Sequence, residues 1–281
     1  MLSVVIPAHD EAAVIGQCLR RIVAGARPGE IDVVVVCNAC VDDTAGVARS
    51  LGPPVRVVET PVGSKPHALN TGDAASEHFP RFYVDADVQM TIEDLRTVAA
   101  AMDEERALVA APSLRVDTSA SNLLVRAYYR IWLRLQWVQD GLIGSGVYAM
   151  TEGGRRRFTE FPSVGADDLW VRAHFDRHER VSVREATFTV PASRTAREVV
   201  RRKARILAAN RLLNSEIAGL PGAMAPSPQR VLGVVRQDWR LAPAAVVYII
   251  IGALAVFEGR RMARTGNVRW GGDRRHLQAP S

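Results

Sequence analysis

The stretch LSVVIPAHDE, residues 2–11, is an apolar run that ends in a polar turn, and a helical pattern of apolar residues follows it to residue 22. The same order of apolar run, polar loop and helical pattern repeats over residues 31–51, and residues 55–58 form a third apolar run. Strands that alternate with helices imply right-handed crossovers and a mostly parallel sheet. The sequence therefore predicts an α/β fold whose strand ends deliver polar residues to one edge.

The tripeptide Asp85-Ala86-Asp87 also stands at the end of a predicted strand. It follows the short apolar run 82–84 and precedes a helical segment that starts at Thr91. Open α/β sheets bind ligands at the carboxyl ends of their strands. One or two carboxylates together with substrate phosphates are a usual site for Mg²⁺ or Mn²⁺. Because successive side chains of an extended chain point in opposite directions, only one of the two aspartates is expected to reach the cation directly. Taken alone, the tripeptide would favour a solvated turn, because such a pair of aspartates often occurs by chance.

Six segments in order resemble motifs of family 2 of the glycosyltransferases, which have the GT-A fold and use nucleotide sugars. They are VVIPAHDE from residue 4, NACVDDT from 38, GSKPHALNTG from 63, DAD from 85, GSGVYAM from 144 and GADDLW from 165. The resemblance runs from residue 2 to about residue 170, with a looser match of basic residues near residue 200. It implies a Rossmann-like, mostly parallel sheet flanked by helices, and an inverting transfer of sugar to an acceptor hydroxyl.

The resemblance also implies roles for individual residues. The donor nucleotide would be bound by Pro7, Ala8, Asp10, Glu11, Asn38, Asp42, Lys65 and Asp85, and the metal by Asp87. The acceptor side would include Gly144, Ser145, Gly146 and Trp170. Asp168 would be the catalytic base, and Asp167 would orient it or the acceptor.

Three positions depart from the family pattern. Asn38 replaces an aspartate, His9-Asp10 replaces a turn that contains asparagine, and Asp167-Asp168 replaces Glu-Asp. An amide both donates and accepts hydrogen bonds, so the base preference is expected to differ. An alternative role for Asp167 is the N-cap of the helix that follows it.

Only two of the 36 basic residues are lysines. Lys65 stands at a helix start, where free amides and the helix dipole favour a phosphate. Lys203 lies in an arginine-rich segment in which positions 194, 197, 201 and 205 share one helical face. A diphosphate clamp of Arg201, Lys203 and Arg205 is one interpretation; a solvated basic face, or one that faces anionic lipid, is the other.

The spacing Cys37-x-x-Cys40 is compatible with a redox or zinc half-site. Zinc needs a second pair of ligands, and neither Cys18 nor the six histidines show such a spacing. We therefore expect small residues that line the nucleotide loop, and the three cysteines favour a reducing compartment.

The chain has 281 residues, a net charge of +6 and a pI near 9.7, which indicates an anionic partner. Nucleic acid is not favoured, because no nucleic-acid-binding motif is present. We expect a catalytic domain over residues 1–220 and an extension over 221–281 that contains the uncharged segment 241–257. This segment predicts a membrane-associated helix, inserted or interfacial, on the cytoplasmic side of the cell membrane, and a core helix of a soluble protein is the alternative.

Residues 122–138 form a second amphipathic segment, which either shares that interface or packs on the sheet. The acceptor is then a lipid-linked molecule, a glycan or a small molecule. Two other classes of function remain open: a catalytically inactive membrane partner that binds a sugar nucleotide or a lipid, and a nucleotidyltransferase.

Overall fold

The apolar runs near residues 2, 31, 55 and 81 form the first four strands, as the sequence predicts. The computed structural model describes residues 1–142, 146–163, 165–221 and 229–265. Among these residues the strands are β1 (Leu2–Ala8), β2 (Ile31–Asn38), β3 (Val55–Thr60), β4 (Arg81–Val84), β5 (Val109–Asp117), β6 (Val147–Met150) and β7 (Arg180–Pro191). The α-helices of the first half are α1 (Ala12–Val23), α2 (Thr44–Arg49), α3 (Lys65–Ala74), α4 (Ile92–Glu104), α5 (Leu123–Trp132) and α6 (Gln136–Gln139). Those of the second half are α7 (Glu152–Arg155), α8 (Asp167–Ala173), α9 (Ala196–Ile217), α10 (Gln229–Gln237) and α11 (Ala242–Thr265).

The seven strands form one sheet in the order β3-β2-β1-β4-β6-β5-β7. Strands β3, β2, β1 and β4 are parallel to one another, and β5 is parallel to β7. Strand β6 runs antiparallel to both of its neighbours, β4 and β5. The predicted mostly parallel sheet is therefore confirmed. The antiparallel strand β6 brings residue 147 to the same edge as the carboxyl end of β4, because Val84 pairs with Val147.

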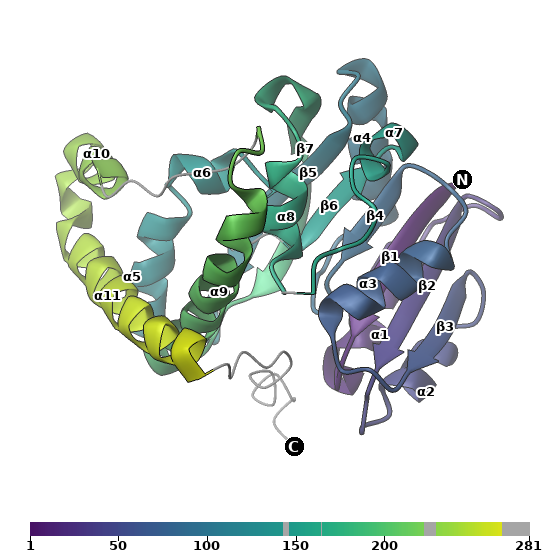
Figure 1. The fold of residues 1–281 in the computed structure, drawn as a ribbon, viewed down its shortest axis with the longest axis horizontal. Helices are drawn as coiled ribbons and strands as arrows, with labels where there is room; N and C mark the ends of the chain where they lie inside the picture. Colours follow the sequence, from purple (N-terminus) through teal and green to yellow (C-terminus); the bar gives the residue numbers. More distant parts are fainter. Residues whose placement is uncertain (143–145, 164, 222–228, 266–281) are drawn as a thin grey trace.

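Alternate side chains of the central strands pack against helices on the two faces of the sheet. Val4, Phe82 and their neighbours contact α1 and α4, whereas Val5 and Tyr83 contact α3 and α8. Figure 1 shows α3 in front of β1 and β2, with α1 behind them. Burial on both faces explains why these strands read as continuous apolar runs.

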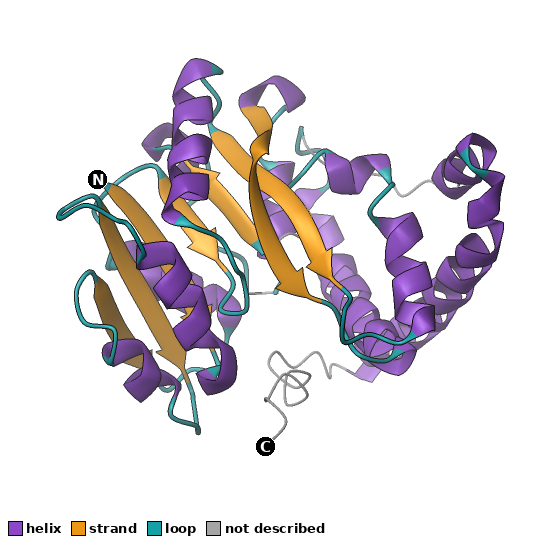
Figure 2. Cartoon of the chain, turned by 180° about the vertical axis from the view of Figure 1, so that it is seen from behind, coloured by secondary structure: helices purple, strands orange, loops and turns teal. Residues whose placement is uncertain are grey.

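The helices α5, α9, α10 and α11 gather at one end of the sheet, as Figure 2 shows. They share a second apolar cluster, to which Tyr128, Val199, Val234 and Ala245 each contribute from a different helix. The second half of α9 instead packs against α8. The segment Trp239–Arg264 is long and apolar enough to cross a membrane by length and composition.

The ends of three helices bear on predictions made from the sequence for Thr91, Asp167 and Arg194. The helix predicted from Thr91 is confirmed, because Thr91 caps α4 through a capping box with Asp94. The N-cap role for Asp167 is wrong: the N-cap is Ala166, and Asp167 is the first residue of α8. Arg194 does not share a helical face with positions 197–205, because Thr195 is the N-cap of α9 and the helix begins after it.

The amphipathic segment 122–138 is two helices rather than one. Asn122 caps α5, which ends at Trp132, and α6 starts only at Gln136. Val125, Tyr128 and Trp132 of α5 are buried in the helical cluster. The buried face of this segment therefore packs on other helices of the protein.

Candidate active site

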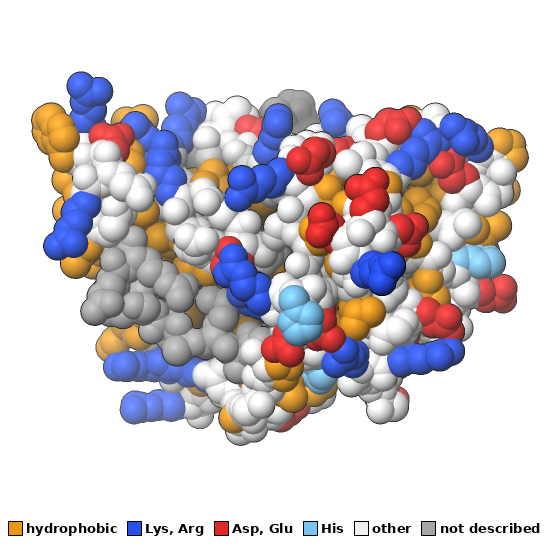
Figure 3. All heavy atoms as spheres, turned by 90° about the horizontal axis from the view of Figure 1, so that it is seen from above, with side chains coloured by type: hydrophobic (Ala, Val, Ile, Leu, Met, Phe, Trp, Pro, Cys, Tyr) orange, Lys and Arg blue, Asp and Glu red, His pale blue; other side chains and the backbone are white. Residues whose placement is uncertain are grey.

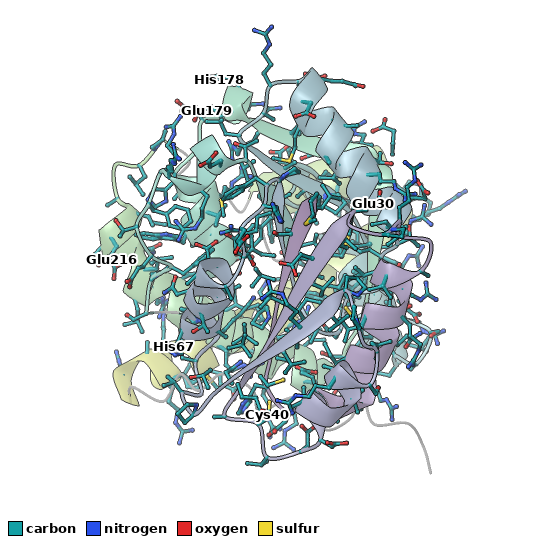
Figure 4. The ribbon with its side chains drawn as sticks, turned by 90° about the vertical axis from the view of Figure 1, so that its right-hand side faces the viewer. Glu30, Cys40, His67, His178, Glu179 and Glu216 are labelled. Atoms are coloured by element: carbon teal, nitrogen blue, oxygen red, sulfur yellow. The ribbon has the colours of Figure 1, made fainter. Side chains whose placement is uncertain are left out.

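The carboxyl ends of β1, β2 and β4 lie at one edge of the sheet, which we call the donor edge because residues predicted to bind the donor follow these strands. Ala8 pairs with Cys37 at the end of the ladder between β1 and β2, and β4 pairs with β1 in parallel. In Figure 4, Cys40 and His67 lie toward the lower end of these strands, and Glu30, which directly precedes β2, lies toward the upper end. The loop after β2 and the start of α3 therefore belong to the donor edge.

Lys65 is the centre of a partly buried ion-pair cluster at this edge. Its ammonium lies 2.8 Å from Asp85 Oδ1 and 2.9 Å from Asp167 Oδ1, and its side chain is only 13% exposed. Burial by itself would lower the pKa of Lys65, but the carboxylates of Asp167 and Asp85 outweigh it and raise the pKa above its usual value. One cation thus joins the Asp-Ala-Asp motif to the acidic pair, which is 82 positions further along the chain.

Tyr148 completes the surroundings of Asp167. The Tyr148 hydroxyl donates a hydrogen bond of 3.1 Å to Asp167 Oδ2, and both side chains are buried. Burial and the nearby Asp167 carboxylate raise the pKa of this tyrosine well above its usual value, so the phenol stays a donor. Each oxygen of Asp167 therefore has a partner that fixes the orientation of its carboxylate.

The Asp-Ala-Asp motif is held by the start of β6. Asp85 N donates a hydrogen bond of 2.8 Å to the carbonyl of Gly146. Gly146 has a φ of +71°, and a Cβ there would lie 3.1 Å from Asp85 Oδ2. Glycine is required because a side chain would be strained and would press on the carboxylate. Gly144 and Ser145, predicted on the acceptor side, lie outside the described residues.

Cys18 is a buried thiol whose pKa is affected by the charges of three carboxylates. Burial raises the pKa of the Cys18 thiol, and so do the charges of Asp87, Asp85 and Glu11. The thiol lies 4.0 Å from the carbonyl oxygen of Asp85. Carboxylate oxygens are the ligands that Mg²⁺ and Mn²⁺ prefer, so the residue type of Asp87 suits a divalent cation, with Asp85 two positions before it.

The loops after β1 and β2 hold each other in place. Asp10 Oδ1 accepts a hydrogen bond of 2.7 Å from Val41 N, and Asp42 Oδ2 accepts one of 3.1 Å from Ala12 N. Asp10, Cys40 and Asp42 also bring three possible metal-ligand atoms within 4.8 Å of one another. The predicted nucleotide residues Asp10 and Asp42 therefore lie side by side.

Pro7, Ala8, Glu11 and Asn38 lie deeper at the same edge and are all buried. Asn38 Nδ2 donates a hydrogen bond of 2.7 Å to the carbonyl of Ala8, while Asn38 Oδ1 has no hydrogen-bond partner among the described residues. The amide at this position joins the ends of β1 and β2, which an aspartate with no amide hydrogen would not do.

The acidic pair occupies the first turn of α8, where the helix dipole favours negative charge. Asp167 faces the protein interior, whereas Asp168 is partly exposed and its Oδ1 accepts a hydrogen bond of 2.7 Å from Leu169 N. Trp170 follows, with its ring 4.5 Å from that of His174, and its buried Nε1 has no acceptor among the described residues. Asp168 is the more accessible of the two acids.

The residues of the predicted diphosphate clamp lie in different surroundings on α9. Lys203 Nζ lies 3.3 Å from the Tyr128 hydroxyl and packs over the rings of Tyr128 and Tyr248, while Arg201 is exposed. Burial lowers the pKa of Lys203. These contacts place the Lys203 ammonium in the helical cluster of α5, α9 and α11; Arg205 is half-buried on the same helix, α9.

Sequence reasoning missed two residues that organise the site, Tyr148 and Asn70. Asn70 Oδ1 accepts a hydrogen bond of 2.8 Å from Phe161 N, and its Nδ2 donates one of 3.4 Å to the carbonyl of Phe161. This pair of bonds ties α3, which carries Lys65, to the segment that leads into α8. Both residues lie inside recognised segments, GSKPHALNTG and GSGVYAM, but only the folded contacts reveal their partners.

A family model described as glycosyl transferase family 2 matches residues 3–160, which is more than half of the chain. The chain therefore belongs to this family, and it is a glycosyltransferase with the GT-A fold. No curated protein sequence matches the chain significantly.

Solved structures with the same fold include enzymes with bound donors. A mannosyltransferase from Pyrobaculum calidifontis, in complex with GDP-Man and Mn²⁺, has a TM-score of 0.60 at 20% identity, covering 94% of this chain and 79% of that one. Glucosyl-3-phosphoglycerate synthase from Mycobacterium tuberculosis, with Mn²⁺, UDP-Glc and phosphoglyceric acid, has a TM-score of 0.58 at 20% identity, covering 81% of each chain. S. aureus TarS with UDP-GlcNAc has a TM-score of 0.54 at 14% identity, covering 94% and 92%. At these identities the likeness establishes the fold.

Proposed function

We propose that the chain is an inverting, divalent-metal-dependent glycosyltransferase that moves a sugar from a nucleoside diphosphate sugar to an acceptor hydroxyl. The observation that carries the proposal is the contact of Lys65 with both Asp85 and Asp167, since it brings the metal motif and the acidic pair to one point. The Mn²⁺ and nucleotide sugars bound by the structural neighbours support the same reading.

The donor lies across the donor edge in this proposal. Its base and ribose contact the loops that carry Asp10, Glu11 and Asp42, and its diphosphate lies near Lys65. A divalent cation held by Asp87, with Asp85 nearby, would neutralise the charge of the leaving diphosphate. The Lys65 ammonium contributes a second positive charge there, and its raised pKa keeps it protonated at neutral pH.

The acceptor hydroxyl approaches from the side of α8. Asp168 takes the hydroxyl proton while the hydroxyl oxygen forms a bond to the anomeric carbon, and the bond from that carbon to the diphosphate oxygen breaks. A single displacement inverts the anomeric configuration. Asp167, fixed by Lys65 and Tyr148, positions the turn that carries Asp168.

The acceptor and the location are also part of the proposal. A lipid-linked or cell-envelope glycan acceptor on the cytoplasmic side of the membrane suits a basic chain with an apolar C-terminal helix. A soluble glycan or a small molecule such as the phosphoglyceric acid of the mycobacterial neighbour is the alternative acceptor class.

Binding of UDP, GDP and dTDP, measured by calorimetry with and without Mn²⁺, tests the donor site. We expect one nucleotide to bind in a metal-dependent way and Asp87→Ala to abolish that binding. In Asp168→Asn, donor binding should stay within about twofold, while transfer falls on the order of 10²- to 10⁴-fold. Retained turnover in Asp168→Asn would remove the base assignment. Failure of all three nucleotides to bind the folded protein would instead favour a catalytically inactive membrane partner.

A further inference from the structure

Two faces of α11 differ in their surroundings although both are apolar. One face packs against α5 and α9 and includes the buried residues Ala244, Ala245, Ile251 and Ala255. The opposite face, which we call the α11 stripe, consists of Val246, Ile249, Ile250, Leu254 and Phe257, which are 53–73% exposed. A helix that is apolar all round but covered on one side needs a second apolar environment.

Positive charges extend the α11 stripe. Arg260, Arg261 and Arg264 are exposed, and at about 100° per residue they continue the same face of the helix. Before the helix, Trp239 is 77% exposed and Arg240 is exposed as well. Figure 3 shows apolar and Lys or Arg side chains together at its left end, the end where α10 and α11 lie in Figure 1.

The packed face ties α11 to the catalytic domain. A Cβ at Gly259 would lie 2.8 Å from the carbonyl oxygen of Ala204, so the backbones of α11 and α9 approach closely there. Helix α9 exposes Arg201, Arg211 and Glu216. If α11 crossed a bilayer while packed in this way, these charges would enter the hydrocarbon at a high cost.

We propose that α11 lies in the plane of one leaflet of an anionic membrane, with the α11 stripe immersed and Arg260, Arg261 and Arg264 on lipid phosphates. An interfacial helix immerses its apolar face by about 5–10 Å, which a single row of side chains can reach. Anionic lipid is the occupant that matches the charge. A second copy of a chain with net charge +6 would bring like charges together.

Sedimentation with vesicles tests the partner, using the full-length protein with phosphatidylcholine alone or with phosphatidylcholine and about 30% phosphatidylglycerol. We expect binding to the anionic vesicles only. The triple variant Arg260→Gln, Arg261→Gln, Arg264→Gln should weaken it on the order of 100-fold, and Phe257→Gln about 10-fold. The matched control is Val41→Gln, which changes an apolar residue that is 91% exposed at the donor edge and should leave vesicle binding unchanged.

Depth measurements distinguish an in-plane helix from a spanning one. An environment-sensitive label is attached at Val246→Cys, Ile250→Cys or Phe257→Cys in a Cys40→Ser background and quenched with lipids labelled at shallow or deep positions. An in-plane helix places all three labels at the same shallow depth. A spanning helix separates the first and last by about 16 Å, at 1.5 Å per residue.

Equal shallow depths together with dependence on anionic lipid support the proposal. Graded depths would overturn it in favour of a spanning helix. Absence of vesicle binding would also overturn it, and a dimer seen by analytical ultracentrifugation that Phe257→Gln dissociates would assign the α11 stripe to self-association. None of these readouts requires catalysis, so the result is independent of the proposed transfer reaction.

Discussion

The two lysines of the chain lie in two regions whose surroundings shift the pKa of the ammonium group in opposite directions. At the donor edge, Lys65 contacts two carboxylates and its pKa is raised. In the helical cluster, Lys203 contacts a hydroxyl and two aromatic rings, and burial lowers its pKa. The first ammonium balances buried negative charge, whereas the second is a cation that aromatic faces tolerate. The comparison shows that ion pairs surround the lysine at the donor edge, whereas aromatic packing surrounds the lysine in the helical cluster.

Replacing each lysine by methionine gives the largest expected contrast. Lys65→Met leaves two partly buried carboxylates without their shared cation, so we expect the free energy of unfolding to fall by about 3 kcal/mol. Lys203→Met keeps the volume and removes only a contact with aromatic rings, so the change should stay below about 1.5 kcal/mol. Urea denaturation of both variants measures the difference, and equal losses would contradict the comparison.

The pH dependence of that contrast follows from the raised pKa of Lys65. A raised pKa in the folded state means that this stabilisation is complete below the unfolded pKa, about 10.4, and is lost as pH rises through the folded value. The difference between wild type and Lys65→Met should therefore be constant from about pH 6 to about pH 9. A steady decline over this range would show that the ammonium titrates there.

Two glycines of α11 test the packing of the helical region. Gly259→Ala places a Cβ against the carbonyl of Ala204, and overpacking of this kind should cost about 2 kcal/mol. Gly252→Ala, on the same helix, meets open space and should stabilise by up to about 1 kcal/mol through helix propensity. Thermal unfolding of the pair measures the two shifts, and opposite signs are expected.

Asn70 tests how the donor edge is joined to the segment before α8. Asn70→Ala removes two hydrogen bonds to the Phe161 backbone and should cost about 1 to 2 kcal/mol. If this residue positions α8, kcat should fall about 10-fold while the donor KM changes little. Asn70→Asp keeps the bond from Phe161 N and should recover part of the kcat, which a purely structural role would not predict.

The smallest effect concerns the thiols at the donor edge. Hydrogen bonding from Cys37 lowers the pKa of Cys40 well below that of a free thiol, whereas burial raises that of Cys18. Because the thiolate is the reactive form, Cys40 should be alkylated by iodoacetamide first, with a rate that reaches half its maximum below about pH 8.5. Peptide mapping identifies the site, and faster labelling of Cys18 would contradict its burial.

Much of this protein could be predicted locally. The strands β1 to β4 and the start of α4 follow from apolar runs and a capping threonine, whose preferences depend on near neighbours in the chain. The ordered segments also pointed to the family, which the match over residues 3–160 confirms. The acidic pair shows the limit of this reasoning, because Ala166 rather than Asp167 caps α8.

The sequence by itself determined the α/β architecture, the glycosyltransferase family and the chemical types of the candidate site residues, because these depend on periodicity and on short ordered motifs. Tertiary structure decided which side chains these residues contact. Lys65 meets Asp167 across 102 positions of sequence, Lys203 meets Tyr128 across 75, and one face of α11 is covered while the opposite face is exposed. Contacts at such separations depend on how the sheet and helices pack in three dimensions, and no local pattern in the chain encodes which side chain a buried charge will meet.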